Sequence, residues 1–113
     1  MNKFLLSCLL FSLSWGAWAG DIKNGRRLVE LNNCASCHGA NLNQPIAAEY
    51  PKIAGQHRDY LFHSLLSYQI KDNARVGRNN GVMVGQMAKF TRQELDDMAA
   101  YIASLPGDLV IKR

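Results

Sequence analysis

Three stretches of the chain place apolar residues at the three-to-four spacing of a helix with one buried face. The first runs from about Asp21 to Asn33, with Asp21 suited to cap its start. The second spans about Arg58 to Asp72. The third begins at the capping-box sequence TRQE, Thr91 to Glu94, and ends at Pro106-Gly107. The positions on the three faces are Ile22, Leu28, Val29 and Leu31; Tyr60, Leu61, Ser64, Leu65 and Tyr68; and Leu95, Met98, Ala99, Ile102 and Leu105.

The segments 39–57 and 73–89 lack this periodicity, and the second is rich in Asn and Gly. We therefore predict two long loops between the three helices. Gly25 lies inside the first predicted helix, where glycine lowers helix propensity. It indicates close packing against another backbone, with an ordinary surface glycine as the alternative.

The first nineteen residues have the layout of a secretory signal peptide. Lys3 precedes an apolar run, and Ala17-Trp18-Ala19 is a small-x-small cleavage pattern. The run is shorter than the ~20 residues of a membrane-spanning helix, and no basic cluster follows it. Cys8 lies within the run, which argues against a lipoprotein. We expect cleavage after Ala19, with residues 20–113 forming one small domain and the mature chain bearing no membrane span.

The charge of the chain favours no nucleic-acid partner. There are 13 basic and 9 acidic residues, for a formal net charge of +4. The basic residues do not gather into one tract, and no nucleic-acid-binding motif is present. A docking face for an acidic protein remains compatible with this mild excess.

Cys34, Cys37 and His38 form the sequence CASCH, which three kinds of chemistry could use. A structural zinc site needs four ligands, and the other histidines, His57 and His63, offer no matching pair. A thioredoxin-type dithiol requires surrounding strands, which the sequence does not predict. Covalent haem attachment has C-x-x-C-H as its specific signature. The sequence therefore favours haem c, held by thioethers from both cysteines, with His38 as the proximal iron ligand.

A haem would also supply apolar core that so short a chain otherwise lacks. We accordingly predict that the protein without haem is largely unfolded. The sixth iron ligand would decide between electron transfer, peroxide chemistry and gas binding. The candidates are Met83, Met87, Met98, His57 and His63. Met98 is most simply a core residue, and spacing alone does not choose between Met83 and Met87.

The chain resembles the class I c-type cytochromes, and most of all the single-domain relatives of the dihaem cytochrome c4 group. The resemblance covers nearly the whole chain after residue 19. It is carried by CASCHG, by YPKIAGQHRDYL, and by the Arg- and Asn-rich segment ending in MVGQMAKFTRQELDDMAAYIASL. It implies an all-α fold, a small class I cytochrome c fold with three to four helices and long loops around one covalent haem. The dihaem relatives repeat this domain, whereas the chain has it once.

The resemblance also implies roles for particular residues. In the family, the axial methionine lies seven positions before the Phe-Thr pair at which the last helix starts. Counted back from Phe90, this residue is Met83, and Met87 is the second choice. A proline carbonyl is expected to orient the axial histidine, from Pro51 first and Pro45 second. Gly25 is expected to pack on the C-terminal helix near Tyr101.

With His38 and Met83 both bound to iron, no position is open to a substrate. We therefore expect a periplasmic one-electron carrier that is not an enzyme, with redox proteins docking at the haem edge. The alternatives are a haem-bearing subunit of a dehydrogenase complex, such as a flavocytochrome, or a peroxidase or gas-binding protein. Candidate propionate or docking residues are Arg75, Arg78, Lys52, Lys89, Arg92, Tyr60 and Gln56, of which Tyr60 is also read as a core residue.

Overall fold

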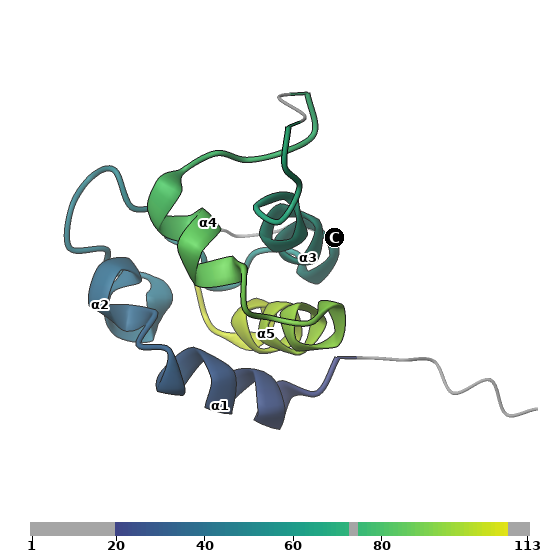
Figure 1. The fold of residues 1–113 in the computed structure, drawn as a ribbon. Coiled ribbons are helices and arrows are strands. Elements are labelled where there is room, and N and C mark those ends of the chain that lie inside the picture. The colour runs from purple at the N-terminus through teal and green to yellow at the C-terminus, as the bar shows by residue number, and fades with distance from the viewer. Residues whose placement is uncertain (1–19, 73–74, 109–113) are drawn as a thin grey trace, which may run out of the picture.

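A computed structural model describes residues 20–72 and 75–108. These residues form five α-helices, one short 3₁₀ helix and no strand. The elements are α1 (Ile22–Leu31), α2 (Ala35–His38), η1 (Ala40–Leu42), α3 (Arg58–Ser67), α4 (Gly81–Met87) and α5 (Arg92–Ser104) (Figure 1). The predicted all-α fold class is confirmed, with the short helices α2 and α4 added to the three predicted ones.

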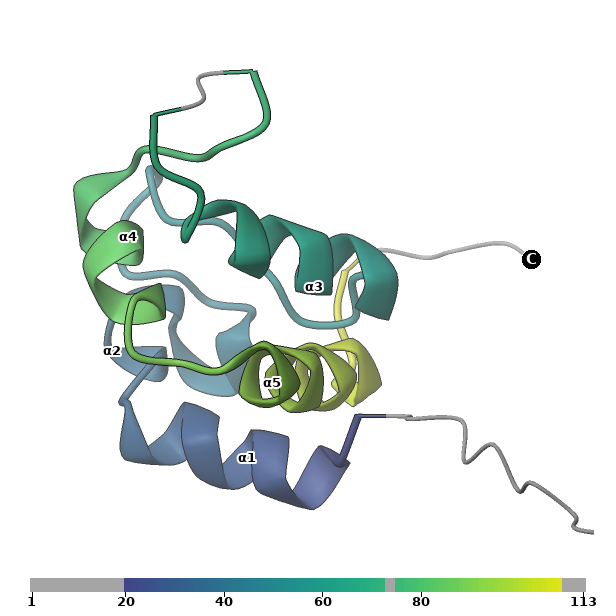
Figure 2. The same cartoon turned by 45° about the vertical axis from the view of Figure 1, so that its right-hand side comes forward.

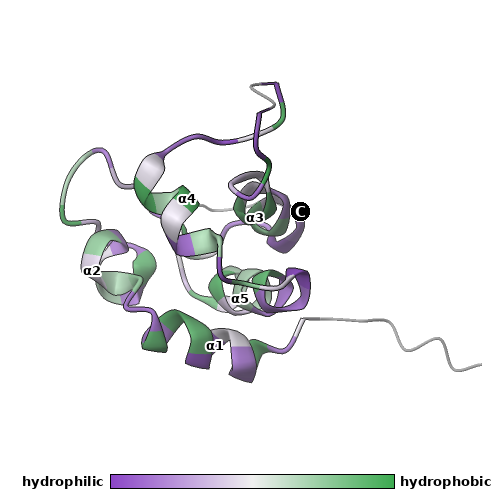
Figure 3. Ribbon diagram, in the orientation of Figure 1, coloured by the Kyte–Doolittle hydropathy of each residue, from purple (hydrophilic) through white to green (hydrophobic). Residues whose placement is uncertain are grey.

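Helix α5 lies between α1 and α3 (Figures 1 and 2). Among the described residues, the pairs α1 with α5 and α3 with α5 make the most extensive helix contacts. Leu95, Met98 and Ile102 on α5 are the largest fully buried side chains. Hydrophobic and hydrophilic residues alternate along the ribbons of α1 and α5, as expected for helices with one buried face (Figure 3). The core is therefore built around the last helix.

Both predicted helix caps are present. The Asp21 carboxylate accepts hydrogen bonds from the backbone N–H groups of Lys23 and Asn24, at 2.9 and 3.2 Å. The Thr91 hydroxyl accepts from the backbone of Glu94, and the Glu94 carboxylate accepts from the backbone of Thr91. These bonds satisfy donors that a helix start otherwise leaves without partners.

Gly25 packs directly on α5, as the sequence predicted. A Cβ atom added there would overlap the backbone carbonyl of Asp97 and lie 2.9 Å from the Cβ of Tyr101. The glycine thus allows two helix backbones to approach closely, which explains why a poor helix former stands inside α1.

Asp97 ties the start of the described chain to α5. Its buried carboxylate accepts from the Asp21 backbone N–H at 2.7 Å, from Asn24 Nδ2 at 2.8 Å and from Gln93 Nε2 at 2.9 Å. Burial acts to raise the pKa of Asp97, but these three hydrogen bonds outweigh it, and the pKa lies below its ordinary value. The carboxylate is therefore held in its charged form.

The structure corrects three details of the helix predictions. Helix α3 ends at Ser67 rather than near Asp72, whose φ of 60° is not helical. Tyr60 is not a core residue, because 55% of its surface is exposed. Ile22 and Leu31 are also exposed, so the buried face of α1 is narrower than its apolar pattern.

The predicted loop 73–89 contains α4. Asn80 caps this helix by accepting a hydrogen bond from the Met83 backbone N–H at 3.1 Å. The predicted loop 39–57 begins with Gly39 at φ 80°, where a Cβ would overlap the carbonyl of Gln44. Only glycine fits this turn without strain, which explains the glycine directly after CASCH.

No helix within residues 20–72 and 75–108 combines the length and the apolar character that a membrane crossing requires. The predicted signal peptide, residues 1–19, lies outside the described residues.

Candidate functional site

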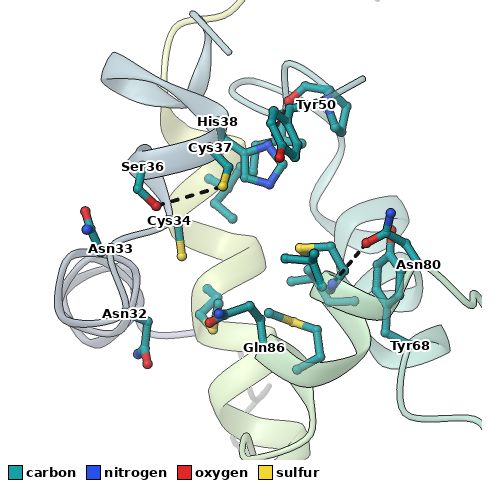
Figure 4. A pocket seen from close by; sticks show the side chains of 18 of the residues that line it. Asn32, Asn33, Cys34, Ser36, Cys37, His38, Tyr50, Tyr68, Asn80 and Gln86 are labelled. Atoms are coloured by element: carbon teal, nitrogen blue, oxygen red, sulfur yellow. Dashed lines mark hydrogen bonds between the residues drawn. The ribbon is translucent and has the colours of Figure 1, made fainter. Parts of the chain in front are cut away.

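A cavity of about 370 Å³ lies between α2 with the segment after it on one side and α4 on the other. This volume falls in the range of small-molecule and cofactor sites. Cys34, Cys37 and His38 project from one side, and Asn80, Gln86 and Tyr68 are seen on the opposite side (Figure 4). The sulfur-bearing side chains in its lining are Cys34, Cys37, Met83, Met87 and Met98.

The two cysteines are presented by a sharp turn directly after α1. Asn33 has φ 52°, and the Cys34 backbone N–H donates to the Val29 carbonyl at 3.3 Å. The next turn is α2, in which the His38 N–H donates to the Cys34 carbonyl at 3.1 Å. One helical turn therefore brings Cys34, Cys37 and His38 to the same cavity wall.

The thiols do not have the character of a redox dithiol. Cys34 and Cys37 are not joined in a disulfide. Burial raises the pKa of the Cys34 thiol, whereas catalytic Cys-x-x-Cys sites lower the pKa of their reactive thiol. Partly buried cysteines at a cavity wall, of which Cys34 has a raised pKa, fit addition to a bound group better than disulfide exchange.

The orientation of His38 is fixed by a backbone carbonyl. The ring is 7% exposed, and its Nδ1 lies 2.8 Å from the carbonyl oxygen of Pro51. A carbonyl only accepts hydrogen bonds, so Nδ1 carries the proton and Nε2 keeps its lone pair for a metal. Pro51, rather than Pro45, is the proline that contacts His38, as the resemblance implied.

The segment that carries Pro51 is itself held in place. The backbone N–H groups of Ile53 and Ala54 both donate to the Leu42 carbonyl, at 3.0 and 3.2 Å. The Gly55 N–H donates to the Ile102 carbonyl on α5 at 3.0 Å. This irregular segment therefore forms a rigid second wall, fixed to the core helix.

Two methionines face the cavity from α4. Met87 is 2% exposed and belongs to the hydrophobic core, whereas Met83 is half-buried and packs against the edge of that core. Met98 also reaches the cavity lining, from its fully buried position on α5. The structure thus brings the predicted residues Cys34, Cys37, His38, Met83 and Met87 to one cavity.

The other candidates lie elsewhere. His57 and His63 are exposed and are not part of the cavity lining. The Arg78 guanidinium approaches the Tyr60 hydroxyl and the Ser64 hydroxyl, at 3.4 and 3.3 Å, on the exposed side of α3. Among the remaining surface candidates, Lys52 pairs with Asp108 at 2.6 Å.

Sequence reasoning missed Asn80, Tyr68 and Gln69. Asn80 and Tyr68 line the cavity, and the Gln69 amide donates to the carbonyls of Met87 and Phe90. Asn80 carried a signal. Asparagine is a preferred helix N-cap residue, and the two methionines that follow it, Met83 and Met87, are spaced as on one face of a helix. Tyr68 was predicted only as part of the apolar face of the second helix, and Gln69 carried no signal, since its role depends on contacts between distant parts of the chain.

The donor set of the cavity fits haem c. A largely apolar cavity has two thiols and a histidine with a free Nε2 on one wall and thioethers on the other, which suits a covalently attached porphyrin with axial ligands on both faces. A zinc site is not supported, because the described residues contain no group of three or more His, Cys, Asp or Glu that could hold a metal ion.

The family model for cytochrome c matches residues 22–106, a range that includes both walls of the cavity. The chain belongs to the cytochrome c family. As a member of this family, it carries one covalently bound haem c. The resemblance to the class I c-type cytochromes and the cytochrome c4 group is thereby confirmed.

Similar proteins support the same placement. The cytochrome is 40% identical over 106 residues to cytochrome c4 of Pseudomonas aeruginosa, covering 92% of this chain and 49% of that protein. It is 33% identical over 86 residues to cytochrome c-554(548) of Halomonas halodenitrificans, covering 76% of this chain and 98% of that one.

A solved structure shows the same fold. Reduced recombinant cytochrome c4 from Pseudomonas stutzeri matches with a TM-score of 0.68 and 33% identity, covering 80% of this chain and 48% of that chain. The cytochrome therefore spans about half the length of the cytochromes c4 that it matches, and nearly all of the length of cytochrome c-554(548).

Proposed function

We propose that this cytochrome is a periplasmic one-electron carrier. In the proposal, Cys34 and Cys37 would hold the haem by thioether bonds, and His38 and Met83 would bind its iron. The bound haem supplies an iron that cycles between Fe(II) and Fe(III). The protein's residues hold the group, fix its axial ligands and keep water away from it.

The contact between His38 and Pro51 carries this proposal. Because the Pro51 carbonyl holds the Nδ1 proton, the histidine is presented as a neutral ligand with a set tautomer and a set ring plane. A ligand that keeps its position in both oxidation states needs little rearrangement on electron transfer. The methionines Met83 and Met87, which line the same cavity, support a closed coordination sphere rather than an open site for substrate.

Met83 is proposed over Met87 because of how the two side chains are packed. Met87 is nearly fully buried in the core that α4 and α5 share, so moving its sulfur toward the cavity centre would disrupt packing. Met83 lies at the cavity with part of its surface uncovered, in the first turn of α4. A sulfur ligand from this side would favour ferrous iron and raise the reduction potential.

The proposed docking face is the cavity rim, where redox proteins would reach the haem edge. Val82, in the cavity lining, is 56% exposed, and Ser36 and Gln86 are also exposed there. Glu49 is an exposed acidic residue in the lining, and the rim shows no concentration of one charge. We therefore expect a modest dependence of partner reaction rates on ionic strength.

Two methionine variants test the ligand set. Met83→Ala should remove the far-red absorption of thioether-ligated ferric haem and allow the reduced protein to bind carbon monoxide at neutral pH. Met87→Ala should keep that absorption and instead lower the free energy of unfolding by about 2–5 kcal/mol, since it opens a cavity in the core. The measurements are absorption spectra of the oxidised and reduced proteins with and without carbon monoxide, together with denaturant unfolding.

The reverse pattern would assign the iron ligand to Met87. Carbon monoxide binding by the unaltered protein would contradict a closed iron site and favour a gas-binding or peroxidase role. Mass spectrometry of periplasmic material tests export and attachment together, because the expected mass is that of the chain starting at Gly20 plus one haem. Copurification with a larger redox chain would favour a dehydrogenase subunit.

A further inference from the structure

Gln69 makes two hydrogen bonds to the chain around α4. It follows α3 by two residues, and its side-chain Nε2 donates to the Met87 carbonyl at 2.7 Å and to the Phe90 carbonyl at 2.8 Å. Both bonds are partly buried, and they join segments 18 and 21 residues apart. Both amide protons are therefore used on one short stretch, the end of α4 and the turn that leads into α5.

Within the described residues, α4 forms no extensive pair with another helix. The extensive helix pairs of the described residues are α1 with α5 and α3 with α5, and α4 belongs to neither. Its start is capped from within, by Asn80, and the Met87 side chain anchors its last turn in the core. The Gln69 amide is a directional link between α4 and the long helices.

We propose that Gln69 is a positioning residue that sets the place of the Met83 sulfur by holding the end of α4. Met83 and Met87 are four residues apart, so they lie about one helical turn, ~5.4 Å, from each other on the same face. Fixing the Met87 carbonyl therefore fixes the rotation and axial position of Met83. This inference rests on the proposed role of Met83 as iron ligand.

Losing both bonds should make α4 open more often. Phe90 is buried, so its carbonyl would have limited access to water as a replacement donor. Gln69→Met keeps the length of the side chain and removes both donors. We expect the ferric protein of this variant to bind imidazole about 30-fold faster than the unaltered protein, since two net hydrogen bonds correspond to about one and a half decades in an opening equilibrium.

Gln69→Lys should restore part of the behaviour of the unaltered protein, because an ammonium group on a stem one bond longer can again donate to both carbonyls. Gln93→Met is the matched control. It removes a glutamine hydrogen bond to Asp97, which contacts the start of α1 rather than α4, and should leave imidazole binding unchanged.

Amide hydrogen exchange of Val84 and Ala88 supplies a second readout that does not depend on the iron ligand. Faster exchange there in Gln69→Met, with exchange in α5 unchanged, is the expected result. Unchanged imidazole binding and unchanged exchange in α4 would overturn the inference, as would an equal effect in Gln93→Met. If Met83→Ala alone leaves imidazole binding unchanged, the proposed ligand fails, while the exchange measurement still decides whether Gln69 holds α4.

Discussion

The two halves of this cytochrome are stabilised in different ways. Helices α1, α3 and α5 pack on one another through apolar faces, and their contacts include the Gly25 approach and the buried Asp97 carboxylate. On the other side, α2, the segment 39–57 and α4 surround a cavity and make few extensive contacts with other helices. The first half supplies most of the hydrophobic core, whereas the second half adds a few residues such as Leu42 and Met87 and is otherwise arranged around the cavity.

The difference teaches where the fold depends on its cofactor. In the helical half, burial of side chains such as Leu95 and Ile102 supplies the driving force. In the cavity half, backbone hydrogen bonds to Leu42 and Ile102 and the Gln69 link set the shape, but the apolar surface that faces inward needs a haem to cover it. Variants of the two halves should therefore fail in different ways.

The largest effect is expected from Cys34→Ser combined with Cys37→Ser, which prevents covalent attachment. We expect a loss of more than about 5 kcal/mol, the whole stability of a marginal small domain, so that cooperative unfolding disappears. Residual amide protection should persist in α1 and α5 and vanish in α2 and α4. Circular dichroism and hydrogen exchange are the measurements, and Ser36→Ala, which keeps both cysteines, is the control. A double variant with native helix content and a sharp melting transition would contradict the dependence on haem.

A smaller effect is expected from Gly25→Ala in the helical half. The new Cβ would overlap the Asp97 carbonyl, so α1 and α5 must move apart, at a cost of about 3 kcal/mol. Gly85→Ala in α4 is the matched control. No atom lies within 4 Å of its added Cβ, and alanine there should stabilise the helix by ~0.5–1 kcal/mol. Chemical denaturation of the ferric proteins compares the two, and equal effects would refute the close approach of α1 to α5.

The smallest effect is expected from Asp97→Asn, and it depends on pH. Hydrogen bonds hold the pKa of Asp97 below its ordinary value of ~3.9, so its contribution is present above that pH and is lost as pH falls through the lower, folded value. At neutral pH we expect the free energy of unfolding to fall by about 2 kcal/mol, because the NH₂ group of an asparagine at position 97 would face N–H groups that now donate to the carboxylate. The difference in melting temperature should shrink below about pH 4. Asp59→Asn, at a carboxylate that is 90% exposed, should neither lower the free energy of unfolding nor make the difference in melting temperature depend on pH.

The sequence alone predicted the features that depend on local chemistry. Asp21 and Thr91 are caps because short polar side chains satisfy the donors of their own helix start. The CASCH spacing predicted that Cys34, Cys37 and His38 act together at one site, and the resemblance to class I cytochromes predicted the His38–Pro51 contact. Each of these predictions needed only neighbouring residues or a known family pattern.

Features that depend on distant contacts were not predicted. The segment that contains helix α4 lacks helical periodicity and is rich in Asn and Gly, which predicts a loop, whereas the place of the helix is fixed by Gln69 and by burial of Met87. The apolar pattern also continued past Ser67, yet α3 stops there. Gln69 beyond that end reaches carbonyls 18 and 21 residues further along the chain, and no local pattern encodes that reach.

The hydrogen bond from the Asp21 backbone to Asp97 spans 76 positions of the chain. The pairing of the first and last helices therefore cannot form while the polypeptide is still emerging from a ribosome or a translocation channel. During that interval Cys34 and Cys37 have no finished cavity around them, so both thiols stay accessible to a haem before the chain folds around it.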